Sequence, residues 1–190
     1  MPDLLARVRG HVVSGAAHTD NGRKGEADER REGTVFEPAT GEGPSPPGPA
    51  ERRAAAVRTA FAGMLQIRRL TNTGHPAPET VPAPWELHRP VRAIALALEA
   101  SGLPASAVDA SGRRTATGYR VEPGTASGTV RVEWLGPSGS GAAHEEDGEL
   151  ARCAAALREL GWTALLYRGP RRRRFLEVEP PTGSRRPDGR

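Results

Sequence analysis

The last third of the chain contains two stretches in which apolar and polar positions alternate. In the first, arginine and glutamate alternate with Tyr119, Val121, Val130, Val132 and Trp134, and a Gly- and Pro-containing turn at 123–128 divides the stretch in two. A period of two with β-branched and aromatic residues on one side predicts a half-buried antiparallel hairpin. The second stretch, 162–167 and 172–179, is joined by a turn at 168–171 and predicts a second hairpin.

Between the hairpins the apolar spacing changes to that of a helix. The apolar positions three or four residues apart are Leu150, Cys153, Ala154, Leu157 and Leu160. This spacing predicts a helix over 148–160, with Asp147 as its N-cap and Gly161 ending it. The predicted order is therefore ββαββ over about 117–179.

Two more helices are predicted upstream. An apolar stripe follows Pro49 and predicts a helix over 50–70, and a second helix is expected over about 86–101, ended by Gly102 and Pro104. The four prolines of 75–84 predict an extended spacer between them; a polyproline ligand is the alternative. A unit of about 60 residues buries only a modest core, so we expect the upstream helices to complete it.

These elements predict an α+β protein with a small antiparallel sheet packed against its own helix and two upstream helices. Residues 49–180 are expected to form one small domain. Residues 14–50 have no hydrophobic period and are rich in Gly and Pro, so residues 1–48 are predicted to be a disordered or loosely ordered segment, in which 4–13 could form a short helix or strand. Residues 181–190 are expected to form a disordered basic tail.

Charge adds one asymmetry to this picture. The chain carries a net charge of +4, and residues 168–190 alone hold eight basic and three acidic residues. Lys24 is the only lysine among the 27 basic residues, which indicates codon bias in a GC-rich genome, so only the position of the arginines is informative. The basic cluster consists of Arg168, Arg171, Arg172, Arg173 and Arg174.

Three interpretations of this cluster remain open. Guanidinium groups bind phosphates, so the cluster could contact a nucleic-acid backbone. It could also be a solvated turn that protects an edge strand from pairing with other chains, or it could dock on an acidic protein surface.

No residue pattern predicts catalysis, a metal site or a cofactor. His144, the acidic residues after it and Cys153 supply too few ligands at unsuitable spacing for a metal. Cys153 lies on an apolar stripe, where cysteine acts as a small hydrophobe. The glycine-rich 136–141 loop lacks a Gly-Lys-Ser/Thr ending, and the acidic helix entry after it repels phosphate. The sequence therefore favours a non-enzymatic protein.

The single cysteine excludes an intramolecular disulfide, and the chain has neither a secretory apolar segment nor a run of about 18 apolar residues. We expect a cytoplasmic protein without membrane association. The favoured function is an accessory or regulatory protein that contacts a nucleic-acid backbone through the arginine-rich hairpin. The alternative is a protein-interaction module that uses the 50–70 helix or the region of Trp85, with the arginines only solvated.

Overall fold

The computed structural model describes residues 36–169 and 173–181. Its main sheet has four antiparallel strands in the order β3-β4-β6-β5. The bounds are Gly118–Pro123 for β3, Val130–Leu135 for β4, Thr163–Arg168 for β5 and Arg174–Glu179 for β6. The helix α4, Ala142–Glu159, connects the two hairpins. The predicted α+β class and the ββαββ order are confirmed.

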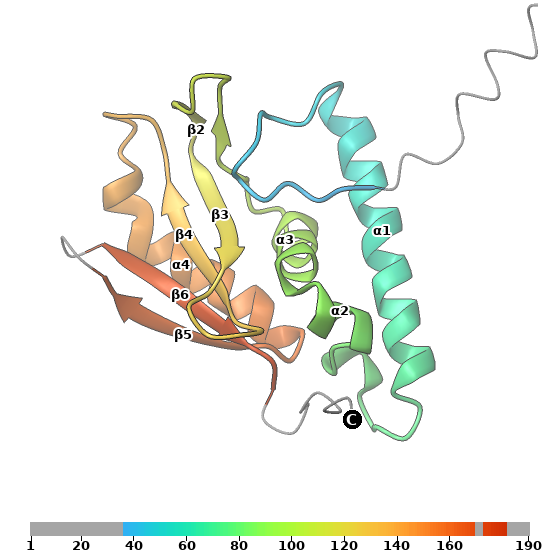
Figure 1. Cartoon of the computed structure of the whole chain (residues 1–190). Helices are drawn as coiled ribbons and strands as arrows, with labels where there is room; N and C mark the ends of the chain where they lie inside the picture. Colours follow the sequence, from blue (N-terminus) through green and yellow to red (C-terminus); the bar gives the residue numbers. More distant parts are fainter. Residues whose placement is uncertain (1–35, 170–172, 182–190) are drawn as a thin grey trace, which may run out of the picture. The chain divides into compact units, whose positions relative to one another are not determined.

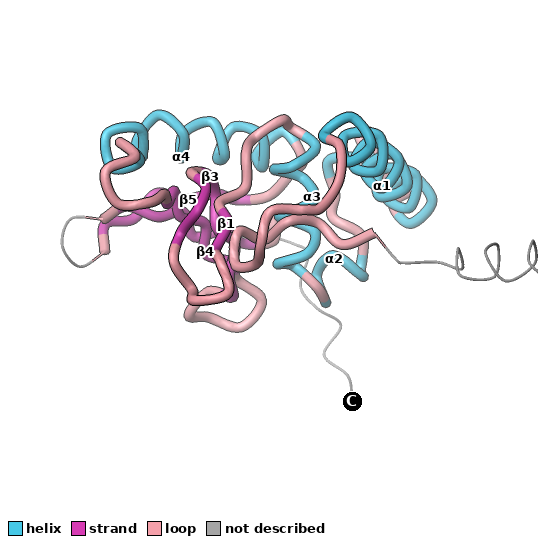
Figure 2. Tube along the Cα trace, turned by 90° about the horizontal axis from the view of Figure 1, so that it is seen from above, coloured by secondary structure: helices cyan, strands magenta, loops and turns pink. Residues whose placement is uncertain are grey.

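One face of this sheet is packed against helices (Figures 1 and 2). The alternation seen in the sequence separates the two faces, since every second residue of a strand points to the same side. The sheet residues buried on the helical side are Tyr119, Val121, Val130, Val132, Trp134, Ala164, Leu176 and Val178. In the described part of the chain, no helix covers the opposite face, which carries arginine and glutamate on β3 and β4.

The helix α4 begins six residues before the predicted start, so the prediction that Asp147 is its N-cap was wrong. The residue before the helix is Gly141, which has a φ of 82° that favours glycine. The buried stripe continues backward from Leu150 through Glu146 to Ala142, each one turn apart. A glutamate in this stripe hid the first turns of the helix from a pattern based on apolar residues.

The upstream helices lie beside α4 rather than on the open face of the sheet. The helix α3, Pro90–Ala100, contributes Ile94 and Leu98 to the main core together with α4 and the strands. The helix α1, Ala50–Thr71, lies outside α3 (Figures 1 and 2) and forms a second cluster of Val57, Met64 and Leu96. Short helices α2, Pro84–His88, and η2, Pro78–Thr80, complete this layer.

A fully buried ion pair fixes α1 in place. Arg68, on the apolar stripe of α1, donates from Nε and Nη2 to the Glu86 carboxylate at 2.7 and 2.6 Å, and both side chains are 0% exposed. Its Nη1 also donates to the carbonyls of Glu79 and Leu160. One guanidinium therefore joins α1, η2, α2 and the C-terminal end of α4.

Part of the segment before α1 lies along β3, although this segment was predicted to be loosely ordered. Thr40 accepts the Val121 N–H at 2.7 Å, and Gly43 accepts the N–H of Val108. Val108 belongs to a separate two-stranded sheet of β1, Ala107–Val108, and β2, Arg114–Ala116. Pro104 accepts the N–H of Tyr119. The β3 edge of the main sheet is thus covered by the protein's own chain.

Candidate interaction edge at β5

The other edge of the main sheet is the strand β5, and its second half is exposed. Ala164 is only 1% exposed because the helices cover it. Leu166 lies on the same face but is 52% exposed, so the cover ends between these two residues. On the opposite face, Leu165 and Tyr167 are 41% and 43% exposed. Three consecutive apolar residues therefore face solvent on both sides of an edge strand.

The hydrogen-bond pattern shows which backbone groups this edge offers. Gly169 donates its N–H to the Arg173 carbonyl at 2.7 Å, which makes these two a hydrogen-bonded pair. Bonded and non-bonded pairs alternate along an antiparallel ladder, so Tyr167, Leu165 and Thr163 also bond to β6. The residues between them direct their N–H and C=O groups away from β6, toward the free edge: Ala164, Leu166 and Arg168.

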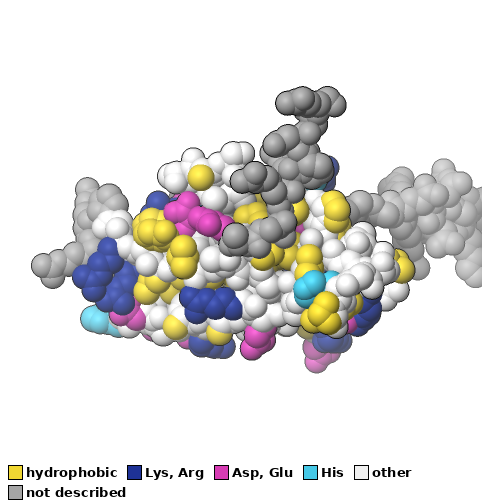
Figure 3. All heavy atoms as spheres, turned by 90° about the horizontal axis from the view of Figure 1, so that it is seen from below, with side chains coloured by type: hydrophobic (Ala, Val, Ile, Leu, Met, Phe, Trp, Pro, Cys, Tyr) yellow, Lys and Arg dark blue, Asp and Glu magenta, His cyan; other side chains and the backbone are white. Residues whose placement is uncertain are grey.

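Two arginines mark the ends of this exposed stretch. Arg158, in the last turn of α4, donates from Nη2 to the Ala164 carbonyl and so covers one outward-facing group. Arg168 is exposed at the other end. Arg168 lies four residue positions after Ala164 along the strand, which corresponds to about 13 Å. On the face seen from below, Figure 3 shows hydrophobic side chains between two groups of basic side chains.

The predicted arginine cluster is divided by the structure. Arg173 donates to the buried Glu146 carboxylate at 2.8 Å and to the Trp134 carbonyl at 3.0 Å. Arg174 forms an ion pair with Asp147 and donates its backbone N–H to Glu146. Acidic residues of α4 therefore neutralise two of the five arginines in the predicted cluster, Arg173 and Arg174.

Of the other cluster members, Arg171 and Arg172 lie outside the described residues. Arg168 has no carboxylate within ion-pair distance among the residues that the structure describes.

The open face beside β5 carries an aromatic pair. Tyr167 and Phe175, opposite each other on β5 and β6, have ring centroids 5.8 Å apart and nearly parallel planes. The Arg131 guanidinium lies 3.8 Å from the centroid of the Phe175 ring. Phe175 is therefore largely enclosed, whereas Tyr167 extends this apolar surface to the edge.

Trp85, the other predicted interaction residue, packs against both apolar clusters and is only partly exposed. Its indole Nε1 is buried without a hydrogen-bond partner in the described part of the chain. Nothing in its surroundings tests an interaction role, which stays a prediction.

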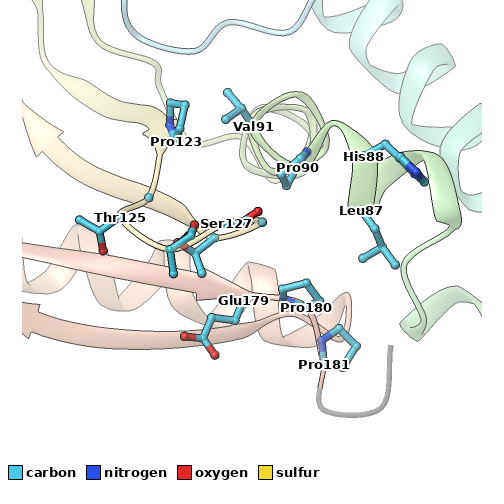
Figure 4. A pocket seen from close by; sticks show the side chains of 14 residues that line it. Leu87, His88, Pro90, Val91, Pro123, Thr125, Ser127, Glu179, Pro180 and Pro181 are labelled. Carbon is cyan, nitrogen blue, oxygen red and sulfur yellow. Dashed lines mark hydrogen bonds between the residues drawn. The ribbon is translucent and has the colours of Figure 1, made fainter. Parts of the chain in front are cut away.

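A hollow of about 990 Å³ lies between the α2–α3 junction, the β3–β4 turn and the end of β6 (Figure 4). Its lining includes Leu87, Pro90 and Pro181, while the Glu179 carboxylate and the His88 ring point away from its centre. His88 Nδ1 lies 2.6 Å from the carbonyl of Pro84 in its own helix. Among the described residues that line it, the acid and base groups therefore do not converge as general acid–base catalysis requires.

A smaller hollow of about 560 Å³ lies at the start of α4, lined by the 136–141 loop, Arg114 and Arg173. Both guanidinium groups are already bonded. Arg114 donates to the Gly41 carbonyl at 2.6 Å and pairs with Glu42, while Arg173 holds Glu146. The glycine-rich loop therefore presents no free cation for phosphate among the described residues.

The remaining candidate groups are also structural. Cys153 is fully buried, and burial, aided by the charge of Glu149, raises the pKa of its thiol to about 12. Within residues 36–169 and 173–181, no three His, Cys, Asp or Glu side chains form a metal-binding group. None of the described helices has the length and apolar character needed to cross a bilayer.

No protein-family model, curated protein or solved structure matches the chain. The β5 edge has to be interpreted from its own geometry. Sequence periodicity predicted β5 but did not indicate that it is an edge strand. The signal available was the run Leu165-Leu166-Tyr167, in which no polar residue breaks the apolar sequence.

Proposed function

We propose that this protein is a protein-interaction module that accepts an extended segment of a partner at the free edge of β5. The observation that carries the proposal is the exposure of Leu165, Leu166 and Tyr167 beside backbone groups that point away from β6. Main-chain hydrogen bonds would supply affinity, and the exposed side chains would supply selectivity.

The contrast between the two sheet edges supports this proposal. Natural sheets protect their edges with charge, proline, bulges or covering segments, because open edges pair with other chains. Here the β3 edge is covered by residues near Thr40 and Pro104, while the outer half of β5 carries apolar side chains. An edge protected only by solvation would be expected to place charges at Leu165 or Leu166.

The test is selection of binding peptides from a random library displayed on phage, with the purified full chain as bait. We expect the selected peptides to shift the backbone amide signals of Leu165–Arg168 in two-dimensional NMR spectra. Binding should be lost in Leu166→Lys, which places a charge at the edge, and kept in Leu70→Lys, which changes an exposed apolar residue on α1. Peptides that shift signals elsewhere would refute the proposal.

A second candidate function is contact with a nucleic-acid backbone, the function favoured by the sequence. Its support is Arg168, exposed and unpaired within the described residues, next to the exposed ring of Tyr167. Backbone binding should retard random single-stranded and duplex DNA or RNA and weaken steeply with salt. Replacement of Arg168, Arg171 and Arg172 by serine leaves the ion pairs of Arg173 and Arg174 intact and should abolish the retardation; equal binding by wild type and variant would exclude this function.

A further inference from the structure

The β5 edge is apolar in its centre and basic at both ends. Leu165, Leu166 and Tyr167 form the centre, Arg158 lies at the Ala164 end and Arg168 at the other. We propose that the segment bound by this edge is an extended peptide in which two or three apolar residues are flanked by carboxylates. This inference rests on the proposed function and adds the chemistry of the partner.

Arg158 limits where the partner strand can pair. Its Nη2 occupies the Ala164 carbonyl, so the backbone groups left for a partner are the N–H of Ala164 and the N–H and C=O groups of Leu166 and Arg168. The paired stretch is therefore short, and the side chains must contribute to binding. Partner residues beside Leu166 would contact its exposed side chain on the helical face, while their neighbours would contact Leu165 and Tyr167 on the open face.

Both arginines are available to carboxylates. Arg158 is exposed, and its side chain donates a hydrogen bond to a backbone carbonyl rather than to an acidic side chain. Within residues 36–169 and 173–181 it forms no ion pair. Guanidinium groups bind carboxylates in a bidentate, directional way, which sets the position of a bound segment along the edge. A partner with lysine at these positions would instead meet like charges.

The same charges disfavour a second copy of this chain as the partner. An antiparallel pair of β5 strands centred on Leu166 would set Arg168 of one copy opposite Ala164 of the other. Arg158 covers Ala164, so two arginines would face each other at each end of the pair. Like charges opposite each other destabilise strand pairing.

The probe is a set of four fluorescein-labelled peptides whose binding to the full chain is followed by fluorescence anisotropy. The first contains Leu-Val-Leu with two glutamates on each side, and the second replaces the glutamates by lysines. The third replaces them by glutamines, and the fourth is the acidic peptide with alternate backbone amides N-methylated. We expect the acidic peptide to bind at least about tenfold more tightly than the glutamine peptide at low salt, with the difference shrinking at high salt. N-methylation should abolish binding.

Two arginine variants test the charge contribution. Arg158→Gln and Arg168→Gln should each remove most of the preference for glutamate over glutamine. Arg152→Gln is the matched control, because Arg152 is an exposed arginine of the same helix that pairs with Glu149. It changes the net charge equally and should leave the preference unchanged.

A proline pair tests the backbone contribution. Leu166→Pro removes an N–H that points to the free edge, so the β5–β6 ladder stays intact and only peptide binding is lost. Leu165→Pro removes an N–H that bonds to β6 and should destabilise the hairpin itself. If Leu166→Pro also unfolds the hairpin, Leu166→Lys replaces it in the binding assay.

Each outcome decides between the proposals. Binding at β5 with equal affinity for acidic, neutral and basic peptides would overturn this inference and leave the proposed function intact. No peptide binding, with a light-scattering mass near twice 20.2 kDa, would identify a second copy as the partner and also overturn it. Retardation of nucleic acid by the wild type, lost in Arg168→Gln, together with no peptide binding would overturn both proposals.

Discussion

At the scale of single residues, the pair of Arg68 and Glu86 is the one ion pair of the described residues in which both side chains are fully buried. Moving two charges out of water is costly, and the cost is recovered only when every donor and acceptor is bonded. Here Arg68 also bonds two carbonyls, and the Ala83 N–H donates to Glu86 at 3.0 Å. Removing one partner would leave the other charge buried alone.

We predict that Arg68→Met lowers the free energy of unfolding by about 3–5 kcal/mol. The double variant Arg68→Met, Glu86→Leu should recover much of this loss, since it leaves no unpaired charge. The control is Arg69→Met, because Arg69 pairs with Glu79 on the surface, where an ion pair contributes about 0–1 kcal/mol. Urea unfolding followed by tryptophan fluorescence measures all three; equal losses for Arg68→Met and Arg69→Met would contradict the prediction.

The buried thiol of Cys153 gives a second residue-scale prediction. Its pKa, raised by burial from 9.0 to about 12, leaves roughly a thousandfold less thiolate at pH 8 than an ordinary cysteine has. Alkylation by iodoacetamide should therefore be very slow in the native protein and fast in urea, as mass spectrometry would show. Rapid native alkylation at pH 8 would mean that the α4 stripe is not packed as described.

At the scale of elements, the strand β3 depends on the segment that precedes α1. Gly41 has a φ of 82° and packs so closely on β3 that an added Cβ would lie 2.3 Å from the Tyr119 carbonyl oxygen. Only glycine satisfies both conditions. Gly41 therefore lets the segment come close enough to β3 for the neighbouring Thr40 to bond to Val121.

We predict that Gly41→Ala detaches this segment from β3. Amide hydrogen exchange at Val121, whose N–H is bonded to Thr40, should then become much faster. The control is Gly48→Ala, in the same segment, which has a φ of 94° but open space around its Cβ position. It carries the backbone strain without the clash, so unchanged exchange in Gly41→Ala, or equal acceleration in both, would contradict the prediction.

The elements differ in how far the sequence predicts them, and the reasons are physical. Strands such as β4 follow from side-chain alternation, because Val130 and Val132 are buried while Arg131 is not. The start of α4 was missed because Glu146 occupies a core position, where its carboxylate is paired by the Arg173 guanidinium and the Arg174 N–H. The cover over β3 was missed because its bonds join backbone groups, which leave no side-chain pattern.

The candidate site was predicted less well than the fold. Arg168 was identified from charge clustering, whereas Arg158, ten residues earlier, belongs to a different element and comes near β5 only through the turn at Gly161. The order of strands in a sheet is a tertiary property, so periodicity alone does not show that Leu166 lies at an edge.

At the scale of the whole described fold, the upstream helices and the ββαββ unit meet at the end of α4. The Leu160 carbonyl accepts a hydrogen bond from Arg68, and Gly161, with a φ of 80°, lies directly against Thr80. An added Cβ at Gly161 would lie 1.7 Å from the Thr80 carbonyl oxygen. Besides the core that α3 shares with α4 and the strands, the upstream part and the ββαββ unit therefore touch at a position without a side chain.

We predict that Gly161→Ala destabilises the protein by more than about 1–2 kcal/mol and broadens the unfolding transition. The reason is that the added methyl group pushes the η2 segment away from the end of α4. Gly112→Ala is the matched control, with a φ of 79° and open space at its Cβ position, and should lose only about 1 kcal/mol. Thermal unfolding followed by circular dichroism measures both, and equal effects would contradict the prediction.

The coverage of β3 by the protein's own chain also limits what the molecule can assemble into. A sheet with two open edges can pass strand pairing from one molecule to the next without end, as fibrils do. In this sheet the β3 edge is already hydrogen-bonded to the carbonyls of Thr40 and Pro104. A molecule that has gained a strand at β5 therefore cannot pair with a further molecule through β3. If β5 accepts a partner strand as we propose, strand pairing through this sheet therefore stops after one addition.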